Sequence, residues 1–103
     1  MMYIEDAKSN LTISGTKATV TATVSGDLNN ATKAKVIAEL QLKSGSSWIP
    51  VEIWTVTNNG SSAKVYETYT VKSNNTYRVK ATVTVWEGSQ SESKTVYSGE
   101  KTV

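Results

Sequence analysis

The sequence predicts an all-β domain built as a sandwich of antiparallel strands, and three observations support this. Apolar and polar residues alternate with a period of two along most of the chain, as in half-buried strands. Thr, Val and Tyr, which fit a pleated surface, are abundant. Clusters of Gly, Asn and Ser recur at short, regular intervals and mark turns. Helical spacing is nearly absent, so we expect close to no helix.

About seven segments carry this strand pattern. The second segment, 17–25, has the clearest alternation near the N-terminus. A shift of its pairing by one residue would bury Thr19, Thr21 and Thr23, so its register is well specified. The sixth is the longest uninterrupted alternation, with Tyr77 first and Val85 last among its inward positions. The predicted strands are 10–14, 17–25, 33–43, 48–57, about 63–71, 76–87 and 91–97.

The segment 48–57 is the least regular of the seven. Ile49, Val51 and Ile53 share one face by alternation, which leaves Trp54 on the presumed outward face. Pro50 has no amide hydrogen for a ladder bond, which favours an edge strand or the start of a strand.

One local pattern resembles the immunoglobulin-like class of Greek-key sandwiches. Tyr77 stands two residues before Val79, where such domains place a tyrosine whose hydroxyl bonds to upstream backbone. The resemblance implies structural roles: Val79 takes the place of the second cysteine of antibody domains, and Ala22 or Val20 takes that of the first. The stretch from Val36 to Leu40 stands in place of their core tryptophan. An apolar pair would thus replace the disulfide.

Two stretches resemble a narrower group of proteins. Leu42 to Trp48 and Thr76 to Val85 resemble strand patterns of small secreted β-sandwich proteins from gut Clostridia and related Firmicutes. The likeness runs from about Leu11 to Tyr97. It implies secretion and fold but no chemistry, because that group has no settled activity; phage structural proteins and bacterial adhesins carry similar modules.

Composition excludes several kinds of site. The chain has 103 residues and neither cysteine nor histidine, so it cannot form a Ser-His-Asp triad, a Cys-His pair, a disulfide or an ordinary zinc site. The net charge is +2 and the lysines are scattered along the sequence, so no basic patch for binding nucleic acid is predicted. No apolar run approaches a membrane span. We expect one domain over 1–103, with 1–8 as a loose N-terminal segment, no cofactor and no enzyme activity.

Aromatic residues are the candidate ligand-binding groups. Trp54 and Trp86 fall on the presumed outward faces of their strands, Trp48 sits at a turn, and Tyr66 could extend an aromatic surface. Exposed aromatic rings stack on sugars or anchor protein partners. The alternative is that these rings only cover the sheet, and the binding hypothesis needs at least two tryptophans to lie close together.

Acidic residues form no convincing site. Glu5, Asp6 and Asp27 offer too few oxygens for calcium, which needs about six. Glu87 and Glu92 flank the last hairpin, and we interpret them as solvated charges rather than as a glycosidase pair.

The leading functional hypothesis is a non-catalytic binding or adhesion module, secreted or on the cell surface, with a protein or glycan as ligand. The alternatives are a passive spacer in a surface or phage assembly and, less favoured, an immunoglobulin-like protease inhibitor. Residues Met1 to Asp6 lack the basic and apolar regions of a signal peptide. Either the native protein starts in this way or a leader has been replaced by a start methionine; the Ser-, Thr- and Asn-rich body looks extracellular, so we favour the second.

Overall fold

The computed structural model describes residues 4–103 and confirms the all-β prediction. Every regular element among these residues is a strand, and every strand pair is antiparallel. The sixth strand has the predicted bounds, and a short eighth strand lies beyond the last predicted one. The strands are β1 (Ile4–Ser14), β2 (Lys17–Gly26), β3 (Lys33–Ser44), β4 (Ser47–Asn59), β5 (Ser62–Thr70), β6 (Thr76–Glu87), β7 (Gln90–Tyr97) and β8 (Lys101–Thr102).

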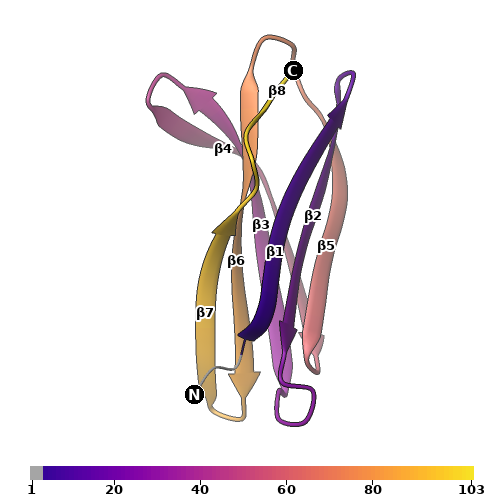
Figure 1. Cartoon of the computed structure of the whole chain (residues 1–103), viewed down its shortest axis with the longest axis vertical. Helices are drawn as coiled ribbons and strands as arrows, with labels where there is room; N and C mark the ends of the chain where they lie inside the picture. Colours follow the sequence, from indigo (N-terminus) through magenta and orange to yellow (C-terminus); the bar gives the residue numbers. More distant parts are fainter. Residues whose placement is uncertain (1–3) are drawn as a thin grey trace.

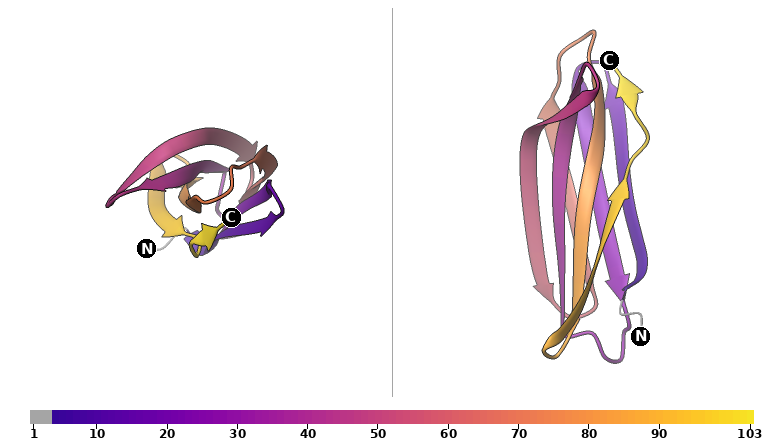
Figure 2. Two further views of the ribbon diagram at one scale, coloured as in Figure 1. Left: turned by 90° about the horizontal axis from the view of Figure 1, so that it is seen from above. Right: turned by 90° about the vertical axis from the view of Figure 1, so that its left-hand side faces the viewer.

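The strands form two sheets packed face to face, as seen from above in Figure 2. A three-stranded sheet has the order β1-β2-β5. A five-stranded sheet has the order β4-β3-β6-β7, with β8 pairing with β6 beyond the end of β7. The molecule is elongated, 45 × 24 × 17 Å, and its strands run along the long axis (Figure 1).

The space between the sheets is filled by the alternating apolar positions of both. On β2 and β6, and on β3 as far as Leu40, every second side chain is buried, as the period of two predicts. The predicted structural residues Ala22, Leu40, Tyr77 and Val79 are all buried. The core consists of Ile4, Leu11, Ala18, Val20, Ala22, Val24, Ala34, Val36, Ala38, Leu40, Ala63, Val65, Val71, Tyr77, Val79, Ala81, Val83 and Val85.

Three hairpins use the same two-residue turn. Gly15, Gly45 and Gly88 each stand first in the turn with φ of 61°, 62° and 65°, whereas the following Thr or Ser has no positive φ. A type II′ turn requires this pattern, and its twist matches that of the flanking strands. The turns set the register of β1 with β2, β3 with β4 and β6 with β7, through the pairs Ser14–Lys17, Ser44–Ser47 and Glu87–Gln90.

The N-terminal segment differs from the prediction. β1 begins at Ile4, whose side chain is 4% exposed and whose backbone N–H donates to Glu92 Oε1 at 2.7 Å. The prediction of a loose segment over 1–8 is therefore wrong for residues 4–8, because Ile4 completes the core and pairs with Gly26. Residues 1–3 lie outside the described residues.

A bulge interrupts the pairing of β3 with β4. Leu40 pairs with Glu52 but Gln41 pairs with Pro50, which leaves Val51 as an extra residue on β4. Such an insertion bends its strand and increases the local twist. Beyond it, the tip of the hairpin, which we call the β3–β4 arm (residues 42–51), turns away from the sandwich (Figure 1).

Candidate functional site

The outer face of the five-stranded sheet carries most of the groups capable of recognition. It consists of the alternate residues of β4, β3, β6 and β7 that point away from the core. Arg78, for example, lies between the buried Tyr77 and Val79, and so points outward. In register across the two central strands, the outward pairs are Lys33–Trp86, Lys35–Thr84, Ile37–Thr82, Glu39–Lys80 and Gln41–Arg78.

Arg78 is held between two aromatic rings on this face. Its Cζ atom lies 4.2 Å from the ring centroid of Trp48 and 4.5 Å from that of Tyr97. A guanidinium over a ring face at this distance is attracted by the ring quadrupole. We call Trp48, Arg78 and Tyr97 the aromatic–arginine stack.

Strand register brings the three members of the stack together. The β6–β7 hairpin places Tyr97 opposite Lys80, which is diagonal to Arg78 on the same face. The β3–β4 hairpin places Trp48 opposite Lys43, two residues beyond Gln41, the partner of Arg78. Arg78 thus receives one ring from each side, from strands that are not neighbours of one another.

A chain of hydrogen bonds fixes the guanidinium. Arg78 Nε donates to Gln41 Oε1 at 2.7 Å, and Gln41 Nε2 donates to the carboxylate of Glu39. Gln41 is only 6% exposed, so its amide is a rigid acceptor. Among residues 4–103 the two terminal nitrogens of Arg78 have no acceptor, which leaves both able to bind an anionic group from outside.

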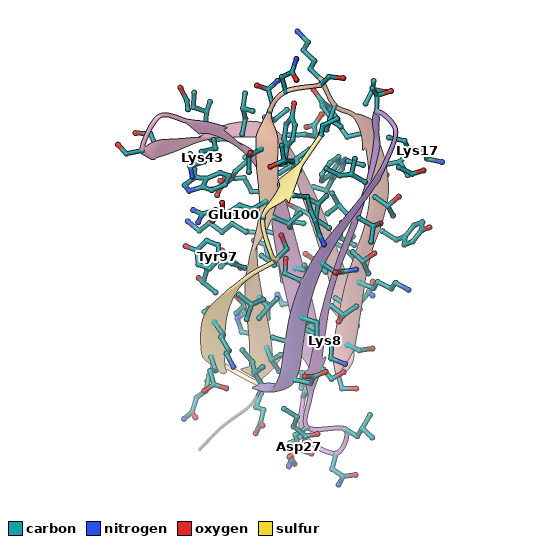
Figure 3. The ribbon with its side chains drawn as sticks, turned by 45° about the horizontal axis from the view of Figure 1, so that its top comes forward. Lys8, Lys17, Asp27, Lys43, Tyr97 and Glu100 are labelled. Carbon is teal, nitrogen blue, oxygen red and sulfur yellow. The ribbon has the colours of Figure 1, made fainter. Side chains whose placement is uncertain are left out.

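Exposed apolar surface borders the stack. Tyr97 is 51% exposed, and Ile53 on β4, in the same cross-strand row, is 50% exposed. Lys43 Nζ lies 3.9 Å from Glu100 Oε1, and Figure 3 shows both residues on the side of the molecule that carries Tyr97.

Trp86 lies at the far end of the same face. Its ring supports the ammonium of Lys33, whose Nζ lies 4.5 Å from the ring centroid. Eight residues along β6 separate Trp86 from Arg78, a distance of roughly 26 Å at about 3.3 Å per residue. Trp48 and Trp86 therefore share a face without forming a cluster, so the structure does not show the two adjacent tryptophans that the aromatic binding hypothesis required.

The expected outward position of Trp54 is wrong. Trp54 pairs with Ala38, packs against the core, and meets Tyr69 edge to face with ring centroids 6.3 Å apart. The extra residue at Val51 shifts the phase of β4, so Ile53 points outward in place of Trp54. Alternation counted from the arm does not hold across a bulge.

Tyr66 is exposed but lies on the opposite side of the molecule. It pairs with Thr21 on the outer face of the three-stranded sheet and is 63% exposed. Its only aromatic or cation–π partner among the described residues is Lys64, with Nζ 5.7 Å from the ring centroid. The four predicted binding residues are thus distributed over three different surfaces.

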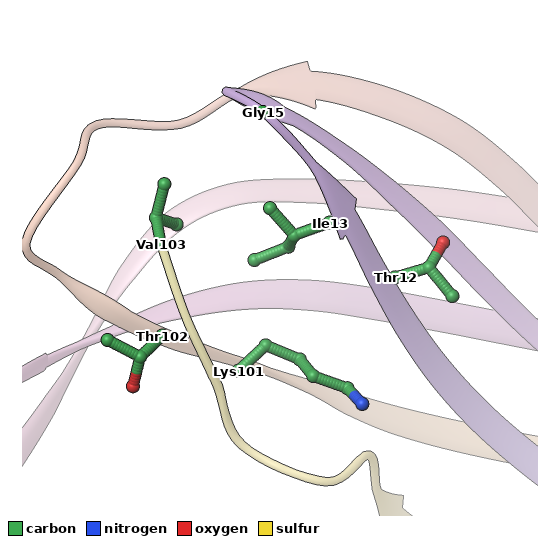
Figure 4. A pocket seen from close by; sticks show the side chains of 6 residues that line it. All are labelled: Thr12, Ile13, Gly15, Lys101, Thr102 and Val103. Carbon is green, nitrogen blue, oxygen red and sulfur yellow. The ribbon is translucent and has the colours of Figure 1, made fainter.

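The surface hollows are lined by few side chains that could take part in catalysis or ligand binding. A hollow of about 430 Å³ lies between β1 and β8, and Figure 4 shows its lining. Its one titratable side chain is Lys101; the other lining residues are Thr12, Ile13, Gly15, Thr102 and Val103. A second hollow, of about 220 Å³, lies under the β3–β4 arm and falls below the roughly 300 Å³ of the smallest usual ligand pockets.

Two of the acidic residues considered from the sequence, Asp27 and Glu92, have structural partners. Glu92 receives the N–H of Ile4, and Asp27 organises the loop after β2. Hydrogen bonds from the backbone of Asn29 and from the side chain of Asn30 hold the pKa of Asp27 below its ordinary value. Within residues 4–103, no three acidic side chains converge as a metal site would require.

Sequence reasoning missed Arg78 and Tyr97. The signal for both was present: the Gly88 turn fixes the β6–β7 register, and counting back along it places Tyr97 beside Arg78. The third member, Trp48, is oriented by the arm beyond the bulge, which the sequence pattern does not reveal.

Comparison with known proteins assigns the chain to no family. No protein-family model matches the chain, and no curated protein matches it significantly. Among residues 4–103 there is no helix long and apolar enough to cross a bilayer. Function must therefore be argued from the chemistry of the surface.

Proposed function

We propose that this domain is a non-catalytic binding module that acts outside the cell or on its surface and engages a protein partner through the outer face of the five-stranded sheet. The observation that carries the proposal is the aromatic–arginine stack. It places a fixed guanidinium and a half-exposed tyrosine on the same sheet face as the exposed Ile53.

The composition of this surface is that of an interface centre. Tyr, Trp and Arg are enriched where alanine substitution costs most binding energy. Arg78 is already ordered by Trp48, Tyr97 and Gln41, so little side-chain entropy remains to be lost when a partner binds. Contacts made by a side chain that is already ordered contribute more to affinity, because less entropy is lost on binding.

The stack favours a protein over a glycan as partner. A sugar binds an aromatic residue by stacking on the open face of its ring. Arg78 covers one face of both Trp48 and Tyr97, and Lys33 covers one face of Trp86. Each ring therefore has one face fewer for a sugar, whereas the ring edges and the exposed Ile53 suit the apolar side chains of a protein.

We also infer that the sandwich is of the immunoglobulin-like class. Two features support this: the strand order of the two sheets, and the hydrogen bond from Lys72 N–H to the hydroxyl of the buried Tyr77. Domains of this architecture commonly serve recognition, although architecture alone does not determine function.

The test is direct binding with variants of the stack. Fluorescently labelled domain is applied to an array of glycans and to immobilised collagen, fibronectin, fibrinogen and mucin. We expect saturable binding to a protein, weakened about tenfold or more by Tyr97→Ala and by Arg78→Lys, which keeps the charge but loses the planar stacking group. Tyr66→Ala, on the opposite face, is the matched control and should bind as the unmodified domain does.

Two outcomes contradict this function. Binding only to glycans would replace the protein partner with a sugar, and binding to none of these probes would leave the spacer hypothesis as the better account. Circular dichroism of each variant checks that its fold is intact, so a loss of binding reports on the surface.

One observation favours the spacer as the second candidate. The start of β1 lies beside Gly26 and Glu92, whereas Val103 exchanges hydrogen bonds with Asn74 and Asn75 at the opposite end of the long axis (Figure 1). Domains with such ends can be joined into a rod. Small-angle scattering of two tandem copies would show a rod of about twice the single-domain length if this geometry is used.

A further inference from the structure

Folding gathers scattered cations onto one face. The outer face of the five-stranded sheet carries Lys33, Lys35, Lys43, Arg78 and Lys80, with the carboxylates of Glu39 and Glu100 beside them. The chain as a whole has a net charge of only +2, so the positive excess on this face exceeds that of the entire molecule.

Most of these cations are not neutralised internally. Among residues 4–103 the ion pairs are Lys8 with Asp6 and Lys43 with Glu100, so Lys33, Lys35, Arg78 and Lys80 take part in none. One oxygen of the Glu39 carboxylate accepts a hydrogen bond from the amide of Gln41.

The cations lie at the two ends of a strip of this face, which is formed by the outward residues of β3 and β6. Lys33 and Lys35 lie at one end of β3, and Arg78 and Lys80 lie at the other end of the face. From Lys33 to Gln41, the partner of Arg78, β3 extends roughly 26 Å at about 3.3 Å per residue. An extended polypeptide of about eight residues has this length.

Between the two ends the strip is apolar and hydroxyl-bearing. Ile37 and Thr82 form its central pair, and the exposed Ile53 and Tyr97 flank the next row. Carboxylates at the ends and apolar side chains in the middle would complement this arrangement.

We propose that the partner is a protein that presents an acidic, partly apolar segment, which lies in extended form along β3 and β6. This inference rests on the proposed function and names the chemistry of its ligand. The free terminal nitrogens of Arg78 would receive one carboxylate in a bidentate pair, and Lys33, Lys35 and Lys80 would attract others. A polysaccharide or nucleic acid would supply the anions but no apolar side chains for Ile37 and Ile53.

The experiment uses a random copolymer of glutamate and tyrosine as the probe, with heparin and duplex DNA as competing polyanions, all at physiological salt. We expect the copolymer to bind the whole domain more tightly than either. The double variant K35Q/K80Q should weaken binding of the copolymer at least about fivefold and flatten its salt dependence. The matched control K17Q/K64Q removes the same charge from the outer face of the three-stranded sheet and should change binding less than about twofold.

Three results would overturn the inference. Equal losses in the two double variants would mean that net charge alone drives binding. Tighter binding of heparin or DNA would assign the face to a different macromolecule. No binding of the copolymer, combined with Tyr97-dependent binding to an immobilised protein, would remove the acidic partner while leaving the proposed function intact; loss of both would remove the two together.

Discussion

The hydroxyl of Tyr77 accepts a hydrogen bond from the backbone N–H of Lys72 at 3.1 Å, across the connection that carries the chain from one sheet to the other. Tyr77 is 4% exposed, so the bond is shielded from water. The sequence predicted a bond from this hydroxyl to upstream backbone, and the structure confirms it. It fixes the β5–β6 connection against the core.

Removing this hydroxyl should destabilise the domain. Tyr77→Phe keeps the ring but leaves the N–H of Lys72 without its acceptor, and we expect a loss of about 1–3 kcal/mol in the free energy of unfolding. Urea denaturation followed by fluorescence measures it. Tyr66→Phe, whose ring is exposed, should leave the midpoint unchanged; an unchanged midpoint for Tyr77→Phe as well would mean that the bond contributes nothing.

A second buried hydroxyl closes the gap between β7 and β8. Ser98, 8% exposed, accepts the N–H of Val79 on its Oγ at 2.8 Å and donates to the carbonyl of Gly99. Ser98→Ala leaves the buried N–H of Val79 unpaired, so we expect a cost of about 1–3 kcal/mol. Hydrogen exchange should show the Val79 amide losing protection, and full retention of that protection would contradict this role. Ser91→Ala, at an exposed position of β7, is the control.

Trp54 and Trp86 should respond differently to truncation. Trp54 packs against the core and Tyr69, so Trp54→Ala should cost about 2–4 kcal/mol through lost burial. Trp86 lies on the outer face under Lys33, and Trp86→Ala should cost about 1 kcal/mol or less. Denaturation midpoints of the two variants compare these costs directly, and a larger cost for Trp86 would reverse our assignment of the two faces.

The loop after β2 should become less stable in acid. The pKa of Asp27 is lowered in the folded state, so its contribution is present above the unfolded pKa and is lost as pH falls through the folded one. Asp27→Asn removes the charge but keeps the shape. The unmodified domain should therefore melt above the Asn variant near neutral pH, and the two melting temperatures should converge below about pH 4. A gap that is constant from neutral pH to about pH 2 would argue against this linkage.

A strand could be predicted where apolar and polar residues alternate without interruption and a turn residue fixes which of them face the core. β6 follows Ser73–Asn75, keeps a period of two and ends at Glu87, just before the Gly88 turn, so its bounds and inward residues agree with the prediction. β8 is too short for any period to emerge: it depends on tertiary pairing with Thr76 and Tyr77. The start of β1 was missed because its polar residues face water on an edge strand, leaving only Ile4 and the half-buried Ala7 as apolar marks.

The candidate site was less predictable, because it depends on register between strands distant in sequence. The importance of aromatic residues could be foreseen, but which of them meet a cation could not. Trp48 and Arg78 are thirty positions apart in the chain, and their contact depends on both the β3–β6 pairing and the bulge. The same limit applies to the lysines, which are scattered in sequence and gathered only by folding.

The single additional residue at Val51 has a consequence for how the molecule can vary. Because the bulge absorbs the change of direction, we expect two-residue insertions at the Gly45 turn to lengthen the arm without disturbing the packed layers beneath. Deleting Val51 should straighten the arm into the plane of the sheet and lift the indole away from Arg78. One backbone insertion thus couples the position of Trp48 to that of the sheet that carries Arg78.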